Sequence, residues 1–326
     1  MLRRRLLAAI LGVFVPTLAS ADALVSDGEI ALEAVGGRID HMAIDLKRQR
    51  LLVAELGNNT VDIVDLPSRQ TAGRITQLAE PQGTGVAAGA DRYVVTSAGD
   101  RTVRLYLAND LPLAGTIDLG RDADNVRIDP KSGNILVGYG SGAIATIDAA
   151  TGTKTGAVNL PVHPKGFQID PSGTRIYVNL PTAHRIAVID RATGSIVSNW
   201  STGTLTGNFP MAIDDKRSLV AVVFRFPSTL VIYDAANGSV KSQLPTCGDA
   251  DDVFVDPKRS RIYVSCGSGA VDVFEAGARE YKHIARIATA SGARTSLFVP
   301  ELDRLFVAAR ATSGTPAAIR IFRPER

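Results

Sequence analysis

Hydrophobic positions along the chain fall in short runs, and groups of Gly, Pro, Asn or Asp residues separate one run from the next. The runs are rich in Val, Ile, Tyr and Phe, as in Arg175–Asn179 (RIYVN) and Arg261–Ser265 (RIYVS). A hydrophobic period of about 3.6 residues, which would indicate amphipathic helices, is almost absent. Short β-branched and aromatic runs bounded by turn residues are typical of strands, so we expect an all-β protein.

The strand pattern itself repeats. Each unit has a first strand that ends in Asp or a turn, two further strands and a short outer strand. An apolar residue near the end of the first strand recurs at intervals of 41 to 44 residues, at Ile44, Val86, Ile128, Ile169, Ile213, Val255 and Phe298. This interval is the length of one four-stranded propeller blade. Seven units predict a seven-bladed β-propeller.

The seventh unit ends with AIRIFRPER (318–326) and has no fourth strand. The stretch IALEAV (30–35) stands before the first unit and belongs to no other. We therefore expect this N-terminal strand to complete the seventh blade and close the ring, within a single domain over residues 22–326.

The second strands RIYVN (175–179) and RIYVS (261–265), together with IDPSG (169–173) and VIDRATG (188–194), resemble YVTN-type β-propeller repeats. The resemblance covers residues 36–326. It implies an exported bacterial or archaeal propeller, and it implies no activity, because that family has no single catalytic motif.

The first residues have the pattern of a signal peptide. Arg3, Arg4 and Arg5 precede an apolar run from Leu6 to Val15, which is too short to span a bilayer. Ala19-Ser20-Ala21 is a small-residue cleavage site. We predict cleavage after Ala21, with Ala23 as the second choice, and a periplasmic protein exported by general secretion rather than by the twin-arginine route.

Removal of this segment changes the charge balance. Lys plus Arg falls from 36 to 33, which equals the 33 Asp plus Glu. No basic stripe remains, so nucleic acid is not an expected partner. No other apolar run is long enough for a membrane span, and we expect a monomer.

Candidate site residues gather where each first strand begins. In a propeller this strand lines the central channel, and its entry loop opens on one face together with the loop between the second and third strands. The third and fourth residues before each repeated apolar position are Asp40-His41, Gln82-Gly83, Asp124-Asn125, Lys165-Gly166, Phe209-Pro210, Asp251-Asp252 and Arg294-Thr295. The second loops add Arg225 and Arg310 to the same channel mouth.

Three interpretations of this ring stay open. The first is structural: Asp40 and Asp251 pair with Arg294, and Asp124 pairs with Lys165. The second is a metal site, and the third is an organic ligand that is anionic or of mixed charge.

In the metal interpretation, Asp40, Asp124, Asp251 and Asp252 supply oxygen ligands for Ca²⁺. Adding His41 would admit Zn²⁺ or another transition ion. The loop residues His163 and His184 form a further metal-ligand pair only if they meet, and loop histidines are more often solvent-facing. In the organic-ligand interpretation, the cations Lys165, Arg225, Arg294 and Arg310 hold an anion.

Cys247 and Cys266 fall in the sixth unit. Regular pairing would place Cys266 opposite about residue 251, which leaves Cys247 too distant for a disulfide. A connecting loop that doubles back would still join the two, so both states stay open.

These patterns favour an exported binding protein that presents a polar, acidic channel mouth to a small molecule, a metal or another exported protein. The contacts would come from Asp40, His41, Asp124, Asn125, Lys165, Arg225, Asp251, Asp252, Arg294 and Arg310. The alternative function is a metal-assisted lactonase or lyase that uses the same mouth, with an ion polarising a carbonyl and Asp or His41 as the base.

Overall fold

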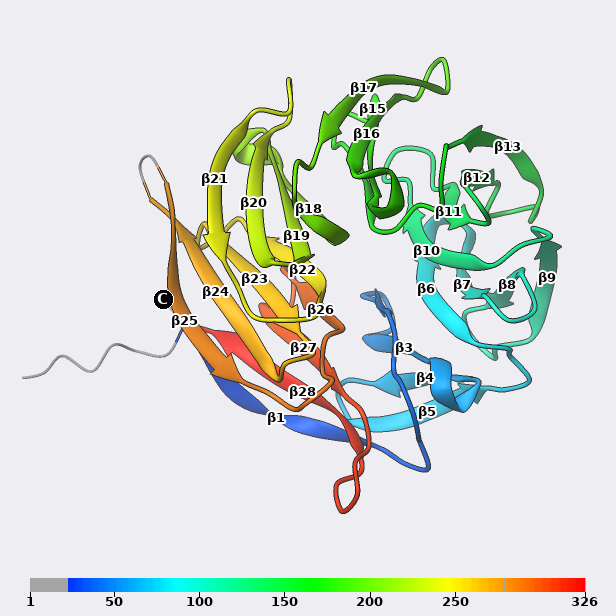
Figure 1. Cartoon of the computed structure of the whole chain (residues 1–326). Coiled ribbons are helices and arrows are strands. Elements are labelled where there is room, and N and C mark those ends of the chain that lie inside the picture. Colours follow the sequence, from blue (N-terminus) through cyan, green and yellow to red (C-terminus); the bar gives the residue numbers. More distant parts are fainter. Residues whose placement is uncertain (1–22, 278–279, 326) are drawn as a thin grey trace, which may run out of the picture.

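The structure, a computed structural model, describes residues 23–277 and 280–325. The described residues form seven four-stranded antiparallel sheets arranged in a ring (Figure 1). The predicted seven-bladed β-propeller is therefore confirmed. The predicted signal peptide, residues 1–21, lies outside the described residues.

The first four blades use consecutive strands. Blade 1 contains β2 (Met42–Asp45), β3 (Arg50–Glu55), β4 (Thr60–Asp65) and β5 (Gln70–Ile75), and blade 2 contains β6 (Pro81–Ala87), β7 (Arg92–Ser97), β8 (Thr102–Leu107) and β9 (Leu113–Asp118). Blade 3 contains β10 (Ala123–Ile128), β11 (Ile135–Tyr139), β12 (Ala143–Ile147) and β13 (Lys154–Asn159), and blade 4 contains β14 (Phe167–Ile169), β15 (Arg175–Leu180), β16 (Arg185–Asp190) and β17 (Ser195–Ser201).

Blades 5 and 6 follow the same order, and blade 7 takes its outer strand from the start of the chain. Blade 5 contains β18 (Thr206–Asp214), β19 (Leu219–Phe226), β20 (Ser228–Asp234) and β21 (Val240–Pro245), and blade 6 contains β22 (Ala250–Asp256), β23 (Arg261–Cys266), β24 (Ala270–Ala276) and β25 (Tyr281–Ala288). Blade 7 contains β26 (Ser296–Val299), β27 (Arg304–Ala309), β28 (Ala317–Pro324) and β1 (Leu24–Leu32). Four single-turn 3₁₀ helices occur in the described chain: η1 (Leu56–Asn58), η2 (Ala88–Ala90), η3 (Pro181–Ala183) and η4 (Asp215–Arg217).

The closing strand is longer than the sequence predicts. The predicted strand over 30–35 is observed as β1, which begins at Leu24 and ends at Leu32. Figure 1 shows β1, in blue, beside β28, in red. Their register runs from Leu24 opposite Pro324 to Leu32 opposite Ala317, with a bulge between Ser26 and Glu29. The bulge and the exposed alternate residues of β1 hide its early half from a search for apolar runs.

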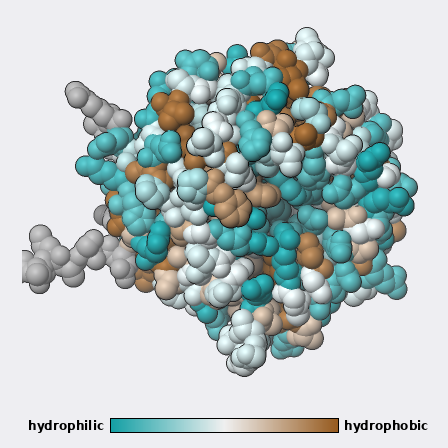
Figure 2. Space-filling model, in the orientation of Figure 1, coloured by the Kyte–Doolittle hydropathy of each residue, from teal (hydrophilic) through white to brown (hydrophobic). Residues whose placement is uncertain are grey.

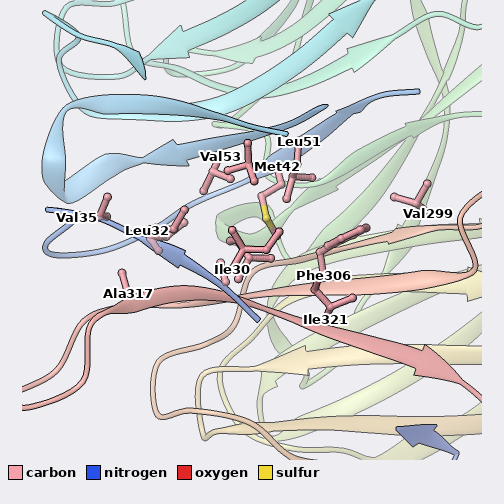
Figure 3. Close-up of a cluster of buried hydrophobic side chains, with 14 residues drawn as sticks. Ile30, Leu32, Val35, Met42, Leu51, Val53, Val299, Phe306, Ala317 and Ile321 are labelled. Carbon is pink, nitrogen blue, oxygen red and sulfur yellow. The ribbon is translucent and has the colours of Figure 1, made fainter. Parts of the chain in front are cut away.

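The hydrophobic core lies between blades rather than at the centre of the ring. In the described part of the chain, buried apolar side chains form one cluster between each pair of neighbouring blades. Alternation along a strand explains this arrangement, because successive side chains point to opposite faces of a blade. Leu51 packs toward blade 7 with Ile30 and Phe306 (Figure 3), whereas its neighbour Leu52 packs toward blade 2 with Tyr93.

The interblade packing leaves the first strands free to line the channel. The face in Figure 2 is mainly hydrophilic, with hydrophobic residues scattered in small groups. In the described residues, no helix has the length and apolar character that a membrane crossing needs.

Candidate functional site

A cavity of about 150 Å³ lies at one end of the central channel, at the predicted mouth. A second cavity of about 280 Å³ is lined by residues farther along the first strands. Both cavities are lined by the same five residues, His41, Arg127, Gln168, Asp252 and Phe254, so they are two parts of one channel. We call the first the mouth cavity and the second the inner cavity.

β-Bulges present the mouth side chains. In four blades the first strand carries one residue more than its partner at the point where it enters the sheet. These bulges fall between Pro81 and Gly83, Ala123 and Val126, Asn208 and Met211, and Ala250 and Asp252. A bulge leaves the extra residue out of the ladder and re-aims its side chain. Gln82, Asp124, Phe209 and Asp251 occupy these positions and line the mouth cavity.

Glycine is required where neighbouring blades approach at the mouth. A Cβ on Gly83 would lie 2.6 Å from the carbonyl oxygen of Asp124, and a Cβ on Gly166 would lie 2.4 Å from that of Phe209. The backbone N–H of Gly166 also donates to the carbonyl of Phe209 at 2.9 Å. These contacts place the bulge of one blade against the first strand of the next.

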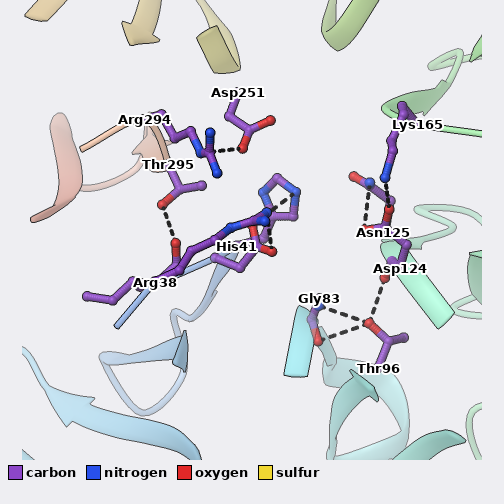
Figure 4. Close-up of polar contacts among 12 residues, drawn as sticks. Arg38, His41, Gly83, Thr96, Asp124, Asn125, Lys165, Asp251, Arg294 and Thr295 are labelled. Atoms are coloured by element: carbon purple, nitrogen blue, oxygen red, sulfur yellow. Dashed lines mark hydrogen bonds and ion pairs between the residues drawn. The ribbon is translucent and has the colours of Figure 1, made fainter. Parts of the chain in front are cut away.

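Most charged groups at the mouth form one-to-one pairs, some of which appear in Figure 4. The pairs are Arg38–Asp40 at 2.8 Å, Lys165–Asp124 at 2.8 Å, Arg225–Asp251 at 2.7 Å, Arg294–Asp249 at 2.9 Å and His41–Asp252 at 3.5 Å. Asp251 also lies 3.2 Å from Arg294. All of the pairs except Arg38–Asp40 join two different blades, so they hold the mouth together as well as giving it charge.

Asp40 is the least satisfied of these carboxylates. It is 1% exposed, and its Oδ1 accepts no hydrogen bond from the described residues. Burial raises the pKa of Asp40 to about 6, although the charges of His41 and Arg38 oppose the shift. The Oδ1 atom is therefore a buried acceptor without a hydrogen-bond donor, in a residue that borders the mouth cavity.

His41 is held as a cation. Burial disfavours its charged form, but the carboxylates of Asp252, Asp40 and Asp251 outweigh burial and raise the pKa of His41 to about 10. A positively charged imidazole donates from both ring nitrogens and cannot serve as a metal ligand or a general base in that state.

Asp124 shows the opposite balance to Asp40. Burial would raise its pKa, but hydrogen bonds from His163 and Lys165 hold the pKa of Asp124 well below its usual range. His163 Nε2 lies 3.4 Å from Asp124 Oδ2, and the pKa of His163 is raised by this contact. Asp124 is consequently an anion that Lys165 and His163 already contact.

Arg127 is the exception to the pairing. It lies on β10, where both cavities meet, and no carboxylate oxygen of the described residues lies within 4.0 Å of its guanidinium. Its Nη1 donates to the carbonyl of Val126 at 2.7 Å, and its Cζ lies 5.5 Å from the centre of the Phe167 ring. Burial lowers the pKa of Arg127, but an arginine stays charged.

The structure brings nine of the ten predicted contact residues to the mouth cavity. The nine are Asp40, His41, Asp124, Asn125, Lys165, Arg225, Asp251, Asp252 and Arg294. Arg310 is exposed, lies against Gly292 and does not line the mouth. The predicted Asp124–Lys165 and Asp251–Arg294 pairs are present, but Asp40 pairs with Arg38 and not with Arg294. Whether these residues bind a ligand stays a prediction.

Sequence reasoning missed Arg38, Asp249 and Arg127. A signal for Arg127 was available in the repeat. The residue directly before the repeated apolar position lines the channel in six blades, as Ala43, Gly85, Arg127, Gln168, Phe254 and Leu297. Arg127 is the one charged residue at this position.

The metal hypothesis gains no geometric support. In residues 23–277 and 280–325, no three His, Cys, Asp or Glu side chains are grouped so that they could hold one ion. An ion at Asp124 or Asp251 would have to displace Lys165 or Arg225 from distances of 2.8 and 2.7 Å. His163 contacts Asp124, whereas His184 is an exposed residue that ends η3.

Cys247 and Cys266 form a disulfide, with their Cα atoms 5.8 Å apart. Of the two states that the sequence left open, the structure has the bridged one. The bulge in β22 puts Ala250, not residue 251, opposite Cys266, and the chain before it doubles back at Asp249, where φ is 60°. The backbone N–H of Cys247 donates to the buried Asp272 at 2.8 Å, which fixes the loop.

Comparison with known proteins finds structures of the same fold but does not assign the chain to a family. No protein-family model matches the sequence, and a search of curated proteins gives no match. Hydrazine synthase from Kuenenia stuttgartiensis is similar in structure, with a TM-score of 0.77 and 18% identity over 89% of this chain and 97% of that chain. A chain in the crystal structure of the mitotic checkpoint complex has a TM-score of 0.74 and 13% identity over 100% of this chain and 99% of that chain.

Both likenesses support one conclusion. The fold is a seven-bladed β-propeller. At such low identities they carry no function to this chain. The YVTN-type resemblance stays a prediction from the sequence, because no family model matches.

Proposed function

We propose that the channel mouth binds a small organic anion and that a carboxylate of this ligand pairs with Arg127. The observation that carries the proposal is the pattern of pairing. Every other cation of the mouth cavity has a carboxylate within 3.5 Å, and Arg127 has none within 4.0 Å among the described residues. A guanidinium that is partly removed from water and has no counter-ion within 4.0 Å is unfavourable, and a ligand anion would supply the missing partner.

The surroundings of Arg127 suit a ligand carboxylate. The contacts to Val126 and Phe167 hold the guanidinium in place, which lowers the conformational entropy lost on binding. Gln168 lines both cavities beside it and donates from Nε2 to the carbonyl of Met211 at 2.9 Å. Lys165 and the protonated His41 add positive charge to the same cavity.

The ligand that this arrangement favours is a carboxylate, because Arg127 is the cation of the mouth cavity that has no counter-ion among the described residues. The signal peptide predicted from the sequence would place this binding in the periplasm.

The alternative of a metal-assisted lactonase or lyase stays a prediction. Of the two bases that it would use, Asp or His41, the imidazole of His41 is already protonated at neutral pH, because its pKa is raised to about 10.

Calorimetric titration with butyrate, succinate and inorganic phosphate tests the proposal. The carboxylates should bind the unaltered protein, and Arg127→Gln should weaken them at least tenfold, because a hydrogen bond to a charged group contributes about 1.5–3 kcal/mol. Arg92→Gln is the matched control: Arg92 is half-buried, donates to the carbonyl of Ala90 at 3.2 Å and lines neither cavity. Absence of binding by every anion, or equal binding by the two variants, would refute the proposal.

A further inference from the structure

The inner cavity differs in chemistry from the mouth. Its wall is built mainly from apolar side chains at the inner ends of the first strands. These are Ile44, Val86, Val126, Ile128, Phe254 and Leu297. Five of the six are only partly buried, although the protein buries most apolar side chains between blades. An apolar wall facing a channel is unfavourable when only water contacts it.

Apart from Arg127, polar groups in the same wall already have partners within the protein. Asp252 Oδ2 accepts from the backbone N–H of Ser296 at 2.8 Å, and Asp252 Oδ1 faces His41. The Thr84 hydroxyl donates to the carbonyl of His41 at 3.3 Å. An occupant of the inner cavity therefore needs few hydrogen bonds of its own.

Arg127 stands at the junction of the two cavities, because it lines both. A carboxylate paired with it would lie where the polar mouth ends and the apolar wall begins. The remainder of the ligand could continue into the inner cavity, whose volume of about 280 Å³ is near the lower end for small-molecule sites.

We propose that the ligand is a carboxylate with an unbranched apolar tail, such as a medium-chain aliphatic acid. Its head pairs with Arg127, and its tail fills the inner cavity against Val86, Ile128 and Leu297. This inference rests on the proposed function and deepens it, since it names the chemical class of the anion.

The test is a chain-length series of butyrate, hexanoate, octanoate and decanoate, titrated into the full protein by calorimetry. Each buried methylene should lower Kd about threefold to fourfold until the inner cavity is full. 1-Octanol and octylamine have the same tail without the carboxylate, and both should bind at least tenfold more weakly than octanoate.

A variant in the inner cavity distinguishes the contribution of the ligand's tail to binding from that of its carboxylate head. Leu297→Asn should weaken octanoate about tenfold and leave butyrate unchanged. Leu113→Asn is the control, because Leu113 is 57% exposed on the outer strand β9, away from both cavities. If Leu297→Asn fails to fold, Val86→Thr keeps the side-chain shape and should give a smaller loss of octanoate binding.

The outcomes distinguish the two proposals. Equal Kd values for butyrate and octanoate would overturn the tail inference and leave anion binding in place. Tight octanoate binding that Arg127→Gln leaves unchanged would overturn both, and so would a failure of all the carboxylates to bind. A Kd that falls with chain length in the unaltered protein, but not in Leu297→Asn, would support the inference.

Discussion

Asp40 reduces the stability of the folded protein at neutral pH. It is buried, one of its oxygens accepts no hydrogen bond from the described residues, and burial raises its pKa from 3.8 to about 6. The folded state therefore holds this proton more tightly than the unfolded chain does. The stability contributed by protonated Asp40 is present below about pH 4 and is lost as the pH rises through 6.

Asp40→Asn should remove this dependence. The free energy of unfolding of the variant, minus that of the unaltered protein, should increase by about 2 to 3 kcal/mol between pH 3.5 and pH 7, because each pKa unit corresponds to about 1.4 kcal/mol. Urea unfolding at a series of pH values measures the difference.

A carboxylate of opposite character provides the control. Asp65 is partly exposed, and hydrogen bonds from Ser68 lower its pKa, so Asp65→Asn should show a difference in unfolding free energy that falls as pH rises. If the free energy of unfolding varied with pH in the same way in Asp40→Asn and in the unaltered protein, the pKa of Asp40 would not be raised in the folded state.

The mouth side chains depend on β-bulges in the first strands, and this part of the site was beyond sequence reasoning. The repeat put Asp124 and Asp251 at the channel, but an even ladder was assumed. One extra residue in β10 and one in β22 change which neighbours each side chain meets. Arg38 was missed for a different reason: it lies two residues before Asp40 in the entry loop, outside the positions that the repeat aligns.

The loop before β22 holds the mouth through the disulfide. Cys247 ties it to Cys266, Gly267 donates to the carbonyl of Asp249 at 2.8 Å, and Arg225 Nε donates to the carbonyl of Ala250 at 2.9 Å. The segment that carries Asp249 and Asp251 is thus anchored from β23 as well as from its own strand.

Replacing both cysteines, Cys247→Ser with Cys266→Ser, should lower the free energy of unfolding by about 3 kcal/mol. The bridge closes a loop of 19 residues, and its loss frees that loop in the unfolded chain. The Kd for butyrate should also rise, because Asp249 and Asp251 would hold Arg225 and Arg294 less firmly. Urea unfolding and calorimetry measure the two effects.

The unaltered protein, unfolded and refolded in a thiol reductant that keeps both cysteines reduced, should match the double variant in stability. Equal stability of the oxidised protein and the double variant would show that the bridge adds nothing to the fold.

The ring as a whole was predictable because its seven units repeat at nearly constant length. The spare N-terminal strand was also predictable, since the seventh unit lacks its fourth strand. Its early boundary was not, because the exposed polar residues Ser26 and Glu29 interrupt the apolar pattern of β1. The side-chain contacts inside the channel join the first strands of different blades. The sequence of one repeat does not show which of these strands lie opposite each other.

The closing strand should contribute strongly to stability. Ile30 and Leu32 are each 1% exposed and pack between blades 1 and 7. Ile30→Ala with Leu32→Ala should lower the free energy of unfolding by about 4 kcal/mol or more, because each truncation of a buried aliphatic side chain costs about 2–5 kcal/mol. Glu29→Ala with Glu33→Ala alters exposed residues of the same segment and should change the unfolding midpoint little. Similar losses for both pairs would contradict the role assigned to β1.

The seam between β1 and β28 also determines when the ring can be completed. Blades 1 to 6 each pair strands that are close in sequence, whereas blade 7 brings Leu24 opposite Pro324. Contacts between distant residues form late, because the entropy of closing the intervening loop must be lost first. A growing chain can therefore build six blades while its first strand still has no partner. The ring closes only when β28 has been synthesised and pairs with β1. The propeller therefore becomes rigid in a single late step.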